Sequence, residues 1–141
     1  MSEGDDRSRR AAGRARMEEV YGFSIDPDEL ANPFHAFTVD HLFGNVWSRP
    51  GLDVRDRRLL TIGVLAAMGR DDLLEVQFES ALRRGELTAE SLFEVTIHVA
   101  HYVGWGPGAA ASVVAERVID RLGLGKPEAG RHGRGGPGGD R

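Results

Sequence analysis

Apolar residues recur at spacings of three and four along most of this chain, which is the period of an amphipathic helix. The first clear segment covers residues 33–47, where Asn32 offers a capping side chain and Pro33 takes the first helical position. Pro50 and Gly51 end this segment. Its apolar positions are Phe34, Phe37, Val39, Leu42, Phe43, Val46 and Trp47. The spacing therefore predicts a helix with one buried face.

Three further helices are expected, each between a capping residue and a Gly that ends it. The residue pairs are Asp53 and Gly69, then Asp71 or Asp72 and Gly85, then Thr88 and Gly104. A fifth helix is expected over residues 109–122, and a sixth over residues 7–20. No segment alternates apolar and polar residues with a period of two. We therefore expect an all-α protein, a compact bundle of about six helices.

The composition changes toward both ends of the chain. Residues 1–17 hold five Arg and are expected to form a flexible or partly helical arm. Residues 123–141 hold eight Gly and almost nothing apolar, so burial cannot offset the entropy of ordering them. We expect one helical domain over residues 18–122, followed by a disordered Gly-rich tail.

Charge and cysteine content exclude several functions. The net charge is −4, although residues 1–17 and 126–141 each carry +2, so the middle of the chain carries −8. An acidic middle argues against a nucleic-acid partner, because phosphate binding needs a basic face. Without cysteine, the chain has no disulfides, thiolate metal sites or thiol redox chemistry. The apolar runs are shorter than the roughly 20 residues of a membrane span, and the N-terminus lacks a signal-peptide pattern. We expect a cytoplasmic protein with no membrane partner.

The segment over residues 44–53 suggests ligand chemistry. It places Trp47 two residues before Arg49, ahead of a Pro-Gly turn. A flat apolar ring beside a planar cation suits a small conjugated carboxylate. The alternative is that Trp47 belongs to the core and Arg49 is solvated.

Five short motifs follow one another in this chain with short spacers. They are Gly-x-Val-Trp-Ser-Arg-Pro-Gly-Leu-Asp, Arg-x-Arg-x-Leu-Leu-Thr, Ala-Ala-Met-Gly-Arg, Ala-Leu-x-x-Gly and Glu-Val-x-Ile-His-Val-Ala-x-Tyr-x-Gly. In this order, over residues 18–122, they resemble the decarboxylase branch of the carboxymuconolactone decarboxylase/alkylhydroperoxidase D superfamily. The resemblance implies an alkylhydroperoxidase D-like fold. It also implies self-association into trimers or hexamers, with pockets near subunit interfaces.

The same resemblance implies a carboxylate or lactone substrate, decarboxylation without a cofactor, and a place in aromatic catabolism. A carboxymuconolactone is its own electron sink, because the breaking bond feeds electrons into the conjugated lactone and forms a dienolate. The peroxidase branch of the superfamily works through a Cys-x-x-Cys pair. This chain contains no cysteine, so peroxidase activity of that kind is excluded.

Two positions depart from the decarboxylase pattern. Asn45 stands where these decarboxylases usually have Glu, and Gln77 stands where they usually have His. An amide can orient a substrate, but it cannot transfer a proton near neutral pH. His41 stands where the family often has Tyr, and it lies six residues before Trp47, so we expect it on a different side of the helix.

Two histidines are the candidate proton donors. His98 matches the family's His, and His101 lies at i+3 on the same helix face. For substrate binding we expect Arg49 and Arg57 to hold the anion, and Asn45 and Gln77 to donate to a carbonyl oxygen. Trp47, Tyr102 and Trp105 complete the predicted pocket.

Each assignment has an alternative. His98 would then be a buried, hydrogen-bonded helix residue, and Arg57 a surface residue of its helix. We expect no metal, because two histidines lack the third ligand of a zinc or iron site, although Glu94 lies at i−4 from His98.

Three functions compete on this sequence. The first is a cofactor-free decarboxylase or lactone-processing enzyme that acts on a small cyclic carboxylate. The second is a diverged family member with another small cyclic substrate. The third is a non-catalytic binding or assembly protein. A polar pocket holding Arg49, Gln77 and His98 would favour the first two, whereas a pocket filled by Phe78 and Trp105 would favour the third.

Overall fold

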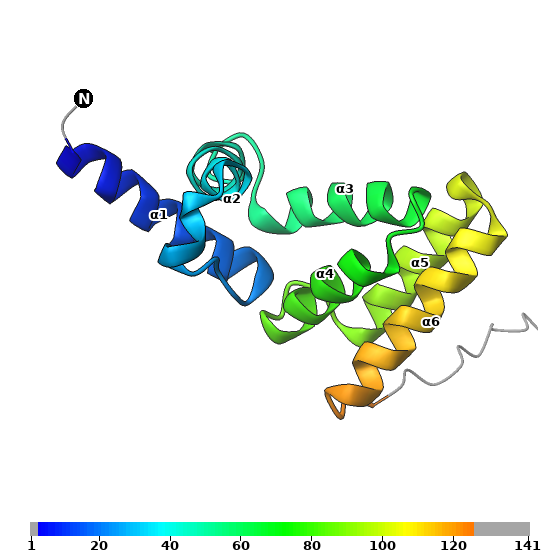
Figure 1. The fold of residues 1–141 in the computed structure, drawn as a ribbon. Coiled ribbons are helices and arrows are strands. Elements are labelled where there is room, and N and C mark those ends of the chain that lie inside the picture. The colour runs from blue at the N-terminus through cyan, green and yellow to red at the C-terminus, as the bar shows by residue number, and fades with distance from the viewer. Residues whose placement is uncertain (1–2, 126–141) are drawn as a thin grey trace, which may run out of the picture.

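The computed structural model describes residues 3–125, and all regular structure in this range is helical (Figure 1). The elements in order are α1 (Glu3–Tyr21), η1 (Pro27–Ala31), α2 (Pro33–Phe37), η2 (Thr38–Val46), α3 (Val54–Ala67), α4 (Asp71–Arg83), α5 (Ala89–Val103) and α6 (Trp105–Arg121). The predicted all-α class with six α-helices is confirmed. Most of the predicted Gly-rich tail, from residue 126 onward, lies outside the described residues. Within residues 3–125 no helix is long and apolar enough to cross a membrane.

The helices form two lobes, each around its own apolar cluster. The first lobe contains α1, α2 and η2, and its buried side chains are Met17, Val20, Val39, Phe43 and Trp47. The second lobe contains α3 to α6 and has the larger cluster, centred on residues such as Ile62, Phe78 and Val118. Figure 1 shows the first lobe at one end of the molecule and the paired helices α5 and α6 at the other.

Most predicted helix ends are confirmed by their local geometry, but α4 has Arg70 at its N-cap, without a side-chain hydrogen bond, and Asp71 and Asp72 lie inside its first turn. The side chains of Asn32, Asp53 and Thr88 each accept a hydrogen bond from a backbone N–H of the helix that follows. Thr88 forms a reciprocal capping box with Ser91. The glycines that end three helices have positive φ, which side chains other than Gly rarely adopt: Gly69, Gly85 and Gly104.

Three helices differ from the prediction. α1 begins at Glu3 rather than at residue 7, and α6 begins at Trp105 rather than at residue 109. Pro107 is tolerated there because it lies in the first turn, where its missing N–H is not needed. The helix predicted over residues 33–47 changes to π-helical bonding at Thr38, and Trp47 N donates to Leu42 O at 2.9 Å.

A close crossing of α1 and η2 organises the first lobe. Gly13 of α1 is buried, and a Cβ placed on it would lie 2.2 Å from the backbone oxygen of Val39. Gly44 of η2 lies at the same crossing, and its Cβ would lie 3.3 Å from that oxygen. Only hydrogen fits at Gly13, so the backbones of the two helices approach closely. This crossing fixes the walls of the pocket described next.

Candidate functional site

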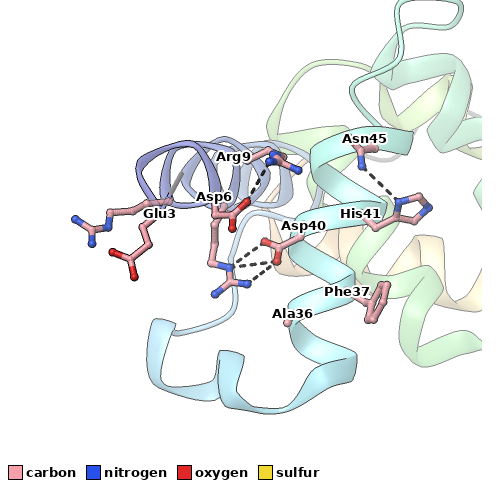
Figure 2. Close-up of a pocket in the computed structure, with 10 residues that line it drawn as sticks. Glu3, Asp6, Arg9, Ala36, Phe37, Asp40, His41 and Asn45 are labelled. Carbon is pink, nitrogen blue, oxygen red and sulfur yellow. Dashed lines mark hydrogen bonds and ion pairs between the residues drawn. The ribbon is translucent and has the colours of Figure 1, made fainter. Parts of the chain in front are cut away.

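A pocket with a volume of about 650 Å³ lies between α1 and the α2–η2 segment. From α1 it is lined by charged residues, namely Glu3, Asp6, Arg7, Arg9 and Arg10. From α2 and η2 it is lined by Ala36, Phe37, Asp40, His41 and Asn45. We call it the α1–η2 pocket. It joins a strongly charged wall to a wall with an aromatic ring, an imidazole and an amide (Figure 2).

Ion pairs occupy much of the charged wall. Arg10 donates to both carboxylate oxygens of Asp40, with Nη2 at 2.6 Å from Oδ2 and Nε at 3.0 Å from Oδ1. This hydrogen bond, with the negative charge of Asp40, raises the pKa of Arg10 above its ordinary value. Arg9 pairs with Asp6 at 3.1 Å. The Arg10–Asp40 pair joins α1 to η2, and both pairs balance the guanidinium charge at the pocket surface.

The opposite wall carries a histidine–asparagine pair. The amide nitrogen of Asn45 lies 3.4 Å from Nδ1 of His41, and both side chains are exposed. In the wide turns of a π-helix, residues four positions apart lie almost above one another, so η2 aligns these two side chains. In Figure 2, Asp40 and His41 extend from different sides of η2, and Phe37 lies on the side of His41.

Sequence reasoning selected Asn45 but not His41. The separation between His41 and Trp47 was expected and is confirmed, because His41 is exposed while Trp47 is buried. What was overlooked was the i, i+4 spacing of His41 and Asn45, which alone indicates that the two side chains meet on a helix.

Trp47 belongs to the core of the first lobe. Its side chain is 7% exposed and stacks on Phe43, with ring centroids 6.2 Å apart. Arg49 is exposed, and its backbone oxygen accepts a hydrogen bond from Nη2 of Arg57 at 2.8 Å. The flat ring-and-cation surface predicted for Trp47 and Arg49 is therefore not formed in this chain, because packing against Phe43 covers the ring. Arg57 also carries a buried Nε that has no hydrogen-bond partner in residues 3–125.

Gln77 lies in the interior of the second lobe, on α4. Its Oε1 accepts a hydrogen bond from Nη1 of Arg58 at 2.8 Å, and both side chains are almost fully buried. The same guanidinium donates from Nε and Nη2 to the two carboxylate oxygens of Glu86. Gln77 thus uses its carbonyl oxygen to complete a buried network around a cation, and does not line the α1–η2 pocket.

The two predicted proton donors lie at the C-terminal end of α5, among exposed aromatic rings. The ring of His98 is 5.1 Å from that of Tyr102, and the ring of His101 is 6.0 Å from that of Trp105. Tyr102 and Trp105 are 80% and 70% exposed. His98 is exposed too, so the alternative that it is a buried helix histidine is wrong.

Hydrogen bonding fixes the tautomer of His101. Its Nδ1 lies 2.7 Å from the backbone oxygen of Ile97, which can only accept, so Nδ1 carries the proton. Trp105 also lines a second, mainly apolar pocket of about 250 Å³ between α5 and α6. No group of three His, Cys, Asp or Glu side chains in the described range is placed to hold a metal ion, and Glu94 is exposed.

The predicted site residues do not meet within one chain. Asn45 lies on η2 in the first lobe, Gln77 lies in the interior of the second lobe, and His98 lies near the far end of α5. Figure 1 shows η2 and the α5–α6 junction at opposite ends of the molecule. A site that combines all three residues cannot form without a second copy of the chain.

Comparisons with known proteins agree with the motifs. The sequence profile described as the carboxymuconolactone decarboxylase family matches residues 32–117. A 4-carboxymuconolactone decarboxylase of Acinetobacter baylyi is 36% identical over 97 residues, which cover 69% of this chain and 72% of that protein. A nitrosuccinic acid decarboxylase of Metarhizium robertsii is 31% identical over 95 residues, covering 66% of this chain and 64% of that protein.

Proposed function

We propose that this chain, which belongs to the carboxymuconolactone decarboxylase family, catalyses the cofactor-free decarboxylation of a small carboxylic acid. Two relatives named as decarboxylases support a carboxy-lyase activity. The alternative of a non-catalytic binding protein is not better supported, because both relatives are named for a decarboxylase activity.

The two relatives point to one chemical requirement for the substrate. A carboxymuconolactone carries a conjugated lactone, and nitrosuccinic acid carries a nitro group on a carbon that also bears a carboxyl group. Each group can accept the electron pair released when carbon dioxide leaves. We therefore propose that the substrate is a small carboxylic acid, and first of all a cyclic one. A group of the substrate itself accepts the electron pair that decarboxylation releases. The protein then has to bind the acid, stabilise the negative charge on the acceptor oxygen and allow one proton to reach the intermediate.

The observation that carries the location of the site is the presence of Asn45 in the α1–η2 pocket. Asn45 stands where the family usually has a carboxylate, and it faces a pocket that guanidinium groups also line. The three Arg and three acidic residues of the pocket balance in charge, and the guanidinium N–H groups are donors that a carboxylate can contact. Phe37 offers an apolar surface in this pocket, with 71% of its area exposed, against which the carbon skeleton of a small acid can pack.

His98 and His101 remain proposals for a second location. The observation in their favour is the cluster of exposed rings around them, next to the apolar pocket at Trp105. These residues can reach Asn45 only from another copy of the chain, so this location requires self-association. We propose such self-association, supported by an exposed apolar row on α3: Leu60, Val64 and Met68, which are 62%, 58% and 64% exposed.

Carbon dioxide release tests the proposed function. Purified protein is mixed with 4-carboxymuconolactone and, separately, with nitrosuccinic acid, each with and without a metal chelator. Turnover of either acid that persists with the chelator supports cofactor-free decarboxylation. Turnover that the chelator abolishes, or no turnover of both acids at high enzyme concentration, rejects the proposal as stated.

A further inference from the structure

We propose that His41 is a catalytic residue of the α1–η2 pocket, and that Asn45 positions it by fixing its tautomer. In this arrangement the Nε2–H of His41 donates a hydrogen bond to the acceptor oxygen of the substrate. The inference rests on the proposed function, since it assigns a role within the same decarboxylation. It departs from the sequence-based expectation that His98 and His101 perform the proton chemistry.

The hydrogen bond from Asn45 determines which ring nitrogen of His41 carries the proton. The amide nitrogen Nδ2 is a donor, and it lies 3.4 Å from Nδ1 of His41. Nδ1 must then offer a lone pair, so the proton of the neutral ring lies on Nε2. Nε2 is the ring nitrogen that points away from Asn45 (Figure 2), and His41 is among the residues that line the pocket.

The neighbouring carboxylates are engaged elsewhere. Asp40, the residue before His41, is held by Arg10 through Nη2 at 2.6 Å, and Asp6 of α1 is paired with Arg9 at 3.1 Å. Glu3 and Arg7 are the remaining charged side chains of the pocket. Asn45 supplies the one hydrogen bond that the His41 ring forms within residues 3–125. The tautomer of His41 is thus controlled by this amide.

The residue at position 45 determines which protonated form of the His41 ring is favoured. A carboxylate at this position, as the family usually has, would accept from Nδ1–H and favour the imidazolium. The amide of Asn45 instead donates, and so favours the neutral ring with Nε2–H outward. With Asn45 at this position, His41 is a neutral hydrogen-bond donor, whereas a carboxylate there would favour the charged imidazolium.

A neutral donor is sufficient for this reaction. The bond between the carboxylate carbon and its neighbour breaks, carbon dioxide leaves, and the electron pair moves into the acceptor group, whose oxygen becomes negative. The Nε2–H of His41 stabilises that oxygen, and a proton from water then converts the dienolate into product. The ring of His41 is neutral before and after the step, and no oxidant or reductant is consumed. Loss of one such donor typically lowers kcat by about 10²–10³-fold.

Nitrogen NMR of His41 tests the positioning role of Asn45 without any assay of activity. The ¹⁵N shifts of the wild-type ring are expected to show a protonated Nε2 and an unprotonated Nδ1, and Asn45→Ala is expected to give a mixture of tautomers. Addition of muconolactone, which lacks the carboxylate that would leave, is expected to shift Nε2. A proton on Nδ1 in the wild type, or no response of Nε2 to muconolactone, would overturn the proposal.

Kinetics test the catalytic role of His41. His41→Phe removes the donor and is expected to lower kcat about 10²-fold or more with a smaller change in KM. His41→Gln keeps an N–H donor and is expected to recover part of that loss. His35→Gln is the matched control, because His35 lies on the neighbouring α2 and its Nδ1 contacts the backbone oxygen of Glu29 rather than Asn45.

The outcomes separate the two proposals. Wild-type turnover together with an unchanged kcat in His41→Phe would overturn the role of His41 and leave the decarboxylase intact. If the wild type turns over neither acid, the proposed function fails, and the NMR response to muconolactone alone decides whether His41 is a ligand-binding residue.

Discussion

Arg58 donates a hydrogen bond of 2.8 Å to the side-chain oxygen of Gln77, and both residues lie in the interior of the second lobe. Gln77 stands at the position where a decarboxylase of this family usually has His. In this chain that position serves a buried cation, and Glu86 balances the charge of Arg58 through two further hydrogen bonds. A protonated histidine in place of Gln77 would lie beside the buried guanidinium of Arg58, which would be unfavourable.

Arg58→Leu is expected to destabilise the protein by about 3 kcal/mol, because it leaves Glu86 and Gln77 without their buried partner. The measurement is urea unfolding followed by circular dichroism. Arg84→Leu is the matched control, since Arg84 contacts the same carboxylate at 3.0 Å from a position that is 38% exposed. It is expected to cost about 1 kcal/mol or less. Equal losses in both variants would contradict the structural role of Arg58.

Gly13→Ala is expected to destabilise the first lobe by roughly 2 kcal/mol, because the new Cβ would lie 2.2 Å from the oxygen of Val39. The helices α1 and η2 would have to separate, which would also open the α1–η2 pocket. Gly63→Ala is the matched control on α3, where a Cβ meets no atom within 4 Å. It is expected to leave stability unchanged or raise it by about 0.5 kcal/mol. Thermal unfolding of the two variants beside wild type compares these effects, and a Gly13→Ala variant as stable as Gly63→Ala would show that the crossing tolerates a methyl group.

Glu79 predicts a dependence of stability on acid pH. Hydrogen bonds from Arg83 and then Arg121 hold the pKa of Glu79 below its ordinary value of 4.5. A lowered folded-state pKa contributes stability that is present above pH 4.5 and is lost as the pH falls through the folded-state pKa. Glu79→Gln is therefore expected to be less stable than wild type at pH 7, with a difference that shrinks toward pH 3.

The unfolding midpoint of Glu79→Gln and wild type in urea, measured across this pH range, checks the prediction. Glu94→Gln is the control, because Glu94 is exposed and forms no ion pair in the part of the chain that the structure describes. A constant difference between Glu79→Gln and wild type at all pH values would contradict the role assigned to the ion pairs.

The apolar row of Leu60, Val64 and Met68 predicts self-association. Light scattering after size exclusion is expected to give a mass several times 15.4 kDa. Val64→Glu would place a charge in the middle of the row and is expected to lower that mass. An unchanged helical content in circular dichroism would show that the variant is folded. A wild-type mass of one chain would exclude self-association.

The helix boundaries followed from the sequence because local residues determine them. Asn32, Asp53 and Thr88 cap their helices through their own side chains, and Gly69 and Gly104 end theirs through positive φ. The π-helical bonding of η2 could not be predicted in this way. No capping or stop residue at Thr38 marks the change of bonding, and Gly13, against which η2 packs, lies far away in the sequence.

The candidate site was predicted less well than the helix boundaries, because it depends on contacts between residues that are far apart in the sequence. Sequence order brings out spacings within one helix, and the i, i+4 pairs His98–Tyr102 and Phe43–Trp47 do contact. It does not show that Gln77 accepts a hydrogen bond from Arg58 in the interior, because that contact joins two helices whose relative position depends on packing. The family motifs selected the candidate residues, and the structure shows which of their side chains are exposed to a ligand.

The most direct test compares His41→Phe with His98→Ala in a carbon dioxide release assay on the acid that the wild type turns over. Because the proposed site lies in the α1–η2 pocket, His41→Phe is expected to lose most of kcat, about 10²-fold or more, while His98→Ala stays close to wild type. Loss of turnover in His98→Ala with an unaffected His41→Phe would contradict this location and move the site to the end of α5.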